Sequence, residues 1–105
     1  MPDKILSLLS LSRRANRISI GFAESKEAVL KGKSRLVIVG SDISAKTEKE
    51  IRFFCKDKII VERISQTREQ ISNAIGKSGG VISVNDEGFA KSLLKLIKEE
   101  PKYVG

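Results

Sequence analysis

Residues 36–39 read Leu36-Val37-Ile38-Val39, an uninterrupted run of aliphatic side chains that are mostly β-branched. Such a run is typical of a strand that is covered on both faces. Shorter apolar or alternating runs predict further strands at residues 18–20, 59–61 and 81–84. Helical patterns occupy the stretches between them. This alternation predicts an α/β protein, a three-layer α/β/α sandwich with about five helices around a four-stranded sheet. We expect a mixed sheet, although the pattern is equally compatible with a parallel one.

Local signals place the ends of the helices. The residues expected to begin helices are, in chain order, Asp3, Gly21, Thr47, Thr67 and Asp86. Both threonines are followed three residues later by Glu or Gln, the pattern of a capping box. Glycines at positions 32 and 76 are expected to end helices, and the proline at position 101 to end the last one. Residues 101–105 are expected to be a frayed tail.

Length and charge bound the class of protein. The chain has 105 residues, which predicts a single domain over residues 1–105. It carries 20 Lys and Arg against 13 Asp and Glu, a net charge of +7. Residues 1–40 hold eight basic and three acidic side chains, whereas residues 81–105 hold four of each. A basic excess confined to one part of a small domain favours a polyanionic partner such as nucleic acid, the alternative being that it only keeps the protein soluble.

Missing residue types exclude several kinds of site. The chain has no His, so an imidazole base and a His metal ligand are excluded. It has one Cys, so it can form neither an intrachain disulfide nor a thiolate zinc cage. Cys55, set among apolar residues, is expected to be a buried free thiol in a reducing compartment. No apolar run approaches the ~18 residues of a membrane helix, and we expect a cytoplasmic protein without metal, cofactor, membrane partner or small-molecule substrate.

Three motifs suggest ligand sites but are better explained otherwise. Two Gly-Lys-Ser tripeptides, at residues 32–34 and 76–78, lack the earlier glycine of a phosphate-binding loop, and each precedes a strand instead of a helix. Asp42 follows a strand at the edge where open α/β sheets bind ligands, so a small nucleotide-binding enzyme is a remote possibility. The favoured interpretation of Asp42 is a turn residue before the next helix.

The segment from Gly21 to Lys26 offers a physical means of binding RNA. A helix N-terminus presents unpaired N–H groups, and a glycine there lets a sugar-phosphate backbone approach closely. Glu24 could accept a hydrogen bond from a base amino group, or it could be an ordinary acidic residue favoured by the helix dipole. Aromatic residues are too few to stack bases, so charge, backbone amides and shape would carry recognition.

Four segments together resemble a known family. They are Leu11-Ser12-Arg13-Arg14-Ala15, residues 21–42, Asn73-Ala74-Ile75-Gly76 and Asp86-Glu87-Gly88-Phe89-Ala90. The chain resembles the kink-turn-binding ribosomal proteins related to archaeal seven-Ae and eukaryotic thirty-e proteins, and most of all the small bacterial YlxQ-like members. The resemblance implies a monomeric, non-enzymatic protein that binds structured, kink-turn-like RNA, expected to be ribosomal.

In that family the start of the second helix enters the RNA at sheared G·A pairs. The family pattern is Gly, a small residue, Asn, Glu, two variable residues and Lys. Gly21 and Glu24 match it, Ala23 and Glu27 depart from it, and Lys26 precedes the family Lys position by one residue. The departures motivate an alternative, a protein-interaction module on the same fold with decayed RNA contacts.

The resemblance also implies contacts outside that helix. A basic residue at the start of the fourth helix corresponds to Arg68, and the loop before the last strand, expected to be flexible because of two glycines, ends at Val81. The predicted RNA-binding residues are therefore Gly21, Glu24, Lys26, Arg68 and Val81. A supporting basic patch is predicted from Arg13, Arg14, Arg17, Lys31, Lys33, Arg35 and Lys77.

Overall fold

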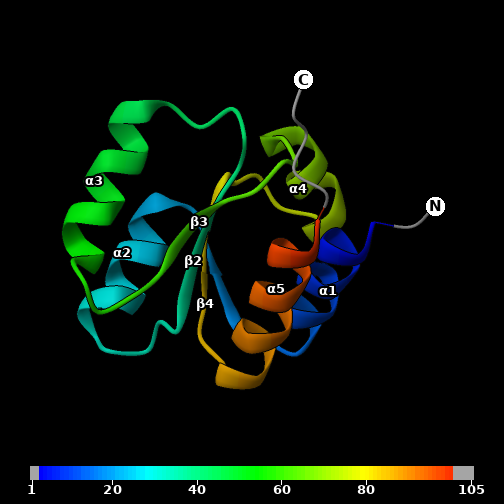
Figure 1. The fold of residues 1–105 in the computed structure, drawn as a ribbon, viewed down its shortest axis with the longest axis horizontal. Helices are drawn as coiled ribbons and strands as arrows, with labels where there is room; N and C mark the ends of the chain where they lie inside the picture. Colours follow the sequence, from blue (N-terminus) through cyan, green and yellow to red (C-terminus); the bar gives the residue numbers. More distant parts are fainter. Residues whose placement is uncertain (1–2, 101–105) are drawn as a thin grey trace.

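Helices and strands alternate along the chain in the computed structural model, which describes residues 3–100 (Figure 1). The helices are α1 (Lys4–Arg14), α2 (Phe22–Leu30), α3 (Ala45–Cys55), α4 (Arg68–Ile75) and α5 (Glu87–Glu99). The strands are β1 (Ile18–Ile20), β2 (Leu36–Val39), β3 (Val61–Arg63) and β4 (Val81–Val84). The predicted three-layer sandwich is confirmed, whereas the predicted frayed tail lies outside the described residues.

The sheet is mixed and has the order β1-β4-β2-β3. Strand β4 is antiparallel to both β1 and β2, while β3 is parallel to β2. The start of β4 therefore lies beside the ends of β1 and β2, at an edge that we call the Gly21 end, marked by Gly21, Gly40 and Gly80. The opposite edge, where β1 and β2 begin and β4 ends, is the Arg35 end, marked by Arg17, Arg35 and Asn85.

Alternate side chains of the central strands feed two cores, one on each face of the sheet. Helices α1, α4 and α5 cover one face of the sheet, and α2 and α3 cover the other (Figure 1). Leu36 and Ile38 pack in the core of the first face, while Val37 and Val39 pack in the core of the second. All four side chains are fully buried, which explains the unbroken apolar run. Each such burial favours the folded state by about 1.5–3 kcal/mol relative to an exposed side chain.

Capping contacts confirm most of the predicted helix ends. The carboxylates of Asp3 and Asp86 accept hydrogen bonds from backbone N–H groups three residues later. Thr67 and Gln70 form both bonds of the predicted capping box. The confirmed free Cys55 is buried at the end of α3, and this burial raises the pKa of its thiol.

Two predicted boundaries are wrong. Helix α3 begins at Ala45, because the Ser44 hydroxyl accepts from the Thr47 N–H at 3.1 Å and so places the cap three residues earlier than predicted. The third strand is Val61–Arg63 instead of residues 59–61. It follows the parallel register with β2, which pairs Val37 with Val61 and leaves the Ile60 side chain half exposed.

Candidate nucleic-acid interface

Gly21 forms the turn between β1 and α2 with φ +102° and ψ 160°, a conformation that favours glycine. Its N–H donates to the Val81 carbonyl at 2.8 Å, so the turn is tied to β4. A β-carbon at this position would meet nothing within 4 Å, which means that the turn faces open space. No side chain caps α2, and the N–H groups of residues 22–24 have no acceptor among the described residues. These amides form an exposed patch of partial positive charge.

A buried hydroxyl fixes the orientation of this first turn. Ser25 is fully buried, and its Oγ lies 3.4 Å from the Ser19 carbonyl and 3.3 Å from the Val81 carbonyl. The start of α2 is therefore joined to both β1 and β4. The sequence analysis treated this serine as a variable position, although its place one helical turn after Gly21 is where a residue facing the sheet must lie.

The loop before β4 is closely packed, contrary to the flexibility expected from its glycines. A β-carbon on Gly79 would lie 2.6 Å from a methyl group of Ile20, and one on Gly80 would lie 2.7 Å from Cγ of Arg68. The Gly80 carbonyl also accepts from the Gly40 N–H at 2.9 Å. Glycine is required here for close approach, and the loop brings Arg68 into the neighbourhood of Gly21.

Asp42 and Arg68 are joined at the same end of the sheet. The Arg68 N–H donates to the Asp42 carboxylate at 2.8 Å, and both side chains are exposed. Asp42 lies in the turn before α3, as predicted, and its carboxylate also anchors the start of α4, a contact that the sequence does not predict. The guanidinium of Arg68 is free of carboxylate partners within residues 3–100 and can pair with an anion.

Arg63 holds the loop that contains Asp42. Its guanidinium donates to the Ser41 and Ile43 carbonyls, and its Nε donates to Glu48 of α3 at 2.7 Å. Burial tends to raise the pKa of Glu48, but hydrogen bonds from Arg52 and Arg63 outweigh it, so the pKa lies below its ordinary value. The sequence does not predict this network, because Arg63 is 15–22 residues away from Glu48, Ile43 and Ser41 along the chain and shares no local pattern with them.

Two predicted contact residues are placed differently from the expectation. Val81 is 3% exposed and packs in the core under α2, so only its backbone belongs to the Gly21 end. The Lys26 ammonium lies 4.3 Å from the centre of the Phe54 ring, which directs it toward α3. Lys77 is exposed in the loop that leads to Gly79. The half-buried Gly21 and the exposed Glu24 and Arg68 thus remain as candidates at the Gly21 end, whereas Lys77 follows the C-terminal end of α4.

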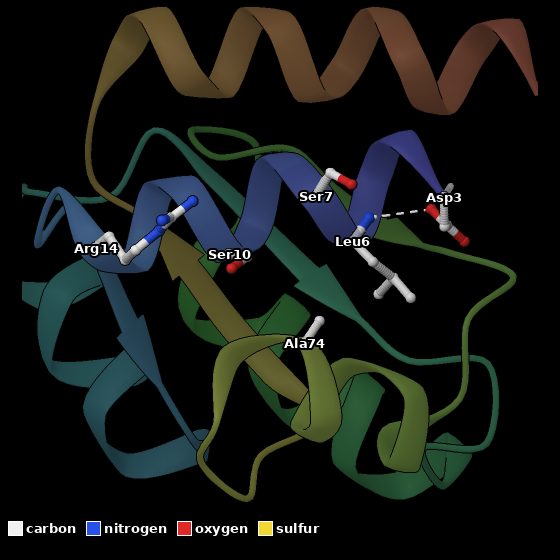
Figure 2. A pocket seen from close by; sticks show the side chains of 6 residues that line it. All are labelled: Asp3, Leu6, Ser7, Ser10, Arg14 and Ala74. Atoms are coloured by element: carbon white, nitrogen blue, oxygen red, sulfur yellow. Dashed lines mark hydrogen bonds between the residues drawn. The ribbon is translucent and has the colours of Figure 1, made fainter. Parts of the chain in front are cut away.

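Most of the predicted basic patch lies at the Arg35 end of the sheet. Arg17 directly precedes β1, and Arg35 directly precedes β2 and donates its N–H to the Val84 carbonyl. Arg14 lies at the opposite end of α1 from Asp3, along a shallow hollow between α1 and α4 (Figure 2). The cations of this group are Arg13, Arg14, Arg17, Lys31, Lys33 and Arg35. Strands of this length span roughly 10–13 Å, so these cations do not surround Gly21 as expected.

Glu27, the acidic residue at the family Lys position, has a basic partner one turn further along the exposed face of α2. Its carboxylate forms an ion pair with Lys31, and a hydrogen bond and the charge of that lysine lower the pKa of Glu27. The same contact raises the pKa of Lys31. One predicted cation of the basic patch is therefore engaged by the residue that replaces the family Lys.

Other kinds of site find little support in residues 3–100. This part of the chain contains no group of three or more metal-ligating side chains that could hold an ion. It also contains no helix that is long and apolar enough to cross a membrane.

Comparison with known proteins identifies relatives over nearly the whole chain. The RNA-binding protein YlxQ of Bacillus subtilis (strain 168) is 28% identical over 91 residues, which cover 86% of this chain and 91% of that protein. The RNA-binding protein YlxQ of Enterococcus faecium is 28% identical over 100 residues, which cover 91% and 93%.

Solved structures share the fold, and one sequence family matches most of the chain. A protein with unknown function from Bacillus halodurans C has a TM-score of 0.87 and 37% identity, covering 93% of this chain and 100% of that one. The Giardia lamblia 15.5kD RNA binding protein has a TM-score of 0.72 and 18% identity, covering 94% and 89%. Residues 3–94 match one family description. The chain belongs to the ribosomal protein L7Ae/L30e/S12e/Gadd45 family.

Proposed function

We propose that this protein binds structured RNA of the kink-turn type at the Gly21 end of its sheet. The observation that carries the proposal is the convergence of the open first turn of α2 with Arg68, across the packed loop of Gly79 and Gly80. The names of the Bacillus subtilis and Enterococcus faecium relatives support RNA as the ligand. The family description names ribosomal proteins, so we expect the RNA target to be ribosomal. We also expect the protein to bind it as a monomer.

Each group at this end would make a different contact. The open space at Gly21 admits the sugar-phosphate backbone, and the free first-turn amides donate to its oxygens. The exposed Glu24 carboxylate accepts from the amino group of a guanine edge presented by a sheared G·A pair. Arg68 and Lys77 bind phosphates at the side of the loop.

The departures from the family pattern define which contacts are lost. Ala23 offers only its backbone N–H, and Lys26 is held against Phe54 instead of at the family position. Recognition therefore depends on Glu24, the amides and Arg68. The cations at the Arg35 end act at longer range, by raising the local potential and the rate of association.

Substitution of Glu24 tests this arrangement. Glu24→Gln should weaken binding to a kink-turn RNA about tenfold or more, because hydrogen bonds to charged groups contribute roughly 1.5–3 kcal/mol. The measurement is a gel-shift titration. Glu50→Gln, the same change at an exposed position of α3, is the matched control and should leave affinity unchanged. Equal affinities for both variants and the parent protein would contradict the proposed role of Glu24.

A further inference from the structure

A groove lies between the C-terminal ends of α2 and α3, away from the Gly21 end. It has a volume of about 550 Å³, and its apolar lining includes Leu30, Phe53, Phe54 and Ile59. Leu30 and Phe53 are 63% and 68% exposed, and Phe53 stands edge-to-face against Phe54 with ring centres 5.3 Å apart. Large apolar side chains exposed together in this way are typical of a protein interaction site.

The charged part of the groove is entirely basic. Arg35, Lys56 and Lys58 line it, and no carboxylate does. Within residues 3–100 none of these cations forms an ion pair, and all are exposed. Arg35 is positioned by hydrogen bonds from its guanidinium to the Gly32 and Ser34 carbonyls, at 3.2 and 3.4 Å. The charge of the groove therefore favours an occupant that carries carboxylates.

The groove also contains a polar group without a partner. Ser34 is fully buried and lines the groove, and its Oγ has no hydrogen-bond partner among the described residues. A buried hydroxyl without a partner is unfavourable, and most such groups in proteins are satisfied. A ligand that supplies a donor or acceptor here would remove that penalty.

We propose that this groove binds a peptide segment of a partner protein, in which apolar side chains are flanked by carboxylates. The apolar side chains would contact Leu30 and Phe53, and the carboxylates would pair with Lys56, Lys58 and Arg35. A peptide is favoured over RNA because apolar side chains outnumber the cations in the lining, and Ser34 is its one hydroxyl among the described residues. This proposal does not depend on RNA binding at the Gly21 end, and the two ligands would not compete.

The test uses the isotope-labelled full chain and defined probes followed by NMR. The first probe is a synthetic peptide with one Phe and one Leu among four Asp or Glu residues; the second replaces the acidic residues with Lys. The acidic peptide should shift the amide signals of Leu30, Ser34 and Phe53, and the basic peptide should not. Phe53→Ser, and separately Lys56→Glu with Lys58→Glu, should weaken binding about tenfold or more.

Two controls distinguish binding in the groove from nonspecific hydrophobic binding and from loss of folding. Leu11→Ser removes a 48% exposed apolar residue on α1 and should leave peptide binding unchanged. Thermal unfolding followed by circular dichroism should show that all variants are folded. Absence of shifts at about 1 mM acidic peptide would overturn the proposal. So would shifts of the same amides by an oligouridylate, or a dimer in sedimentation that Phe53→Ser abolishes, because these assign the groove to RNA or to a second copy.

Discussion

Gly21 shows how much of the site depends on a single backbone conformation. Its φ of +102° is accessible to glycine but strained for residues with a β-carbon, and its N–H is bonded to the strand that carries Val81. Gly32 also has a positive φ, +74°, and likewise faces open space, but it lies at the other end of α2. Comparing the same substitution at the two glycines therefore distinguishes the effect of backbone strain on stability from an effect on ligand binding.

We expect Gly21→Ala to reduce the free energy of unfolding by about 1–2 kcal/mol and to weaken binding of kink-turn RNA. Gly32→Ala should reduce stability to a similar extent but leave RNA affinity unchanged. Urea unfolding and gel-shift titration of both variants provide the measurements. If Gly32→Ala weakened RNA binding as much as Gly21→Ala, the effect would be one of general stability.

At the scale of elements, the loop after β2, whose Asp42 anchors Arg68, is held in place by contacts with α3 and β3. Arg63 connects these three through Glu48 and the Ser41 and Ile43 carbonyls. The hydrogen bonds that Glu48 accepts keep its pKa in the folded state below its ordinary value of 4.5. Its stabilising contribution is therefore complete above the pKa of the unfolded state and is lost as the pH falls through the pKa of the folded state.

Glu48→Gln should accordingly reduce stability by about 1–2 kcal/mol at pH 7, because it weakens charge-assisted hydrogen bonds that fix the loop. The difference from the parent protein should shrink as the pH is lowered below the folded-state pKa, where the parent carboxylate is itself protonated. Urea unfolding at neutral and acidic pH gives the comparison, with Glu50→Gln on the same helix as control. If Glu48→Gln were destabilised relative to the parent protein by the same amount at acidic pH, the shape of the side chain and not its charge would account for the loss of stability.

At the scale of the whole molecule, the sequence predicted the layers, the buried strands and most helix caps, because these follow local periodicity and capping chemistry. Leu36 to Val39 were recognised as central since both faces of their strand are covered. Strand order required the register of β4 against β1 and β2, which no local pattern encodes. The predicted start of β3 is wrong because parallel pairing with β2 determines where that strand lies, and the apolar run at residues 59–61 does not.

The candidate site could be predicted only where its residues are contiguous. The turn at Gly21 was found, whereas Arg63, Ser25 and the close packing of Gly80 are products of the fold. The basic residues before β1 and around the start of β2 were predicted to surround Gly21, and this prediction is wrong. They are near Gly21 in sequence, but each lies a strand or a helix length from it in space, about a Debye length at physiological salt.

The central claim, recognition of kinked RNA at the Gly21 end, is tested most directly by a gel-shift titration at about 0.15 M salt with two RNAs. One is a kink-turn, and the other is the same RNA with its sheared G·A pairs replaced by Watson–Crick pairs. We predict a clear preference for the kink-turn, because Glu24 and the first-turn amides read a shape that only the kinked RNA presents. Equal, salt-sensitive binding to both RNAs would contradict this claim and would show that the protein responds to charge alone.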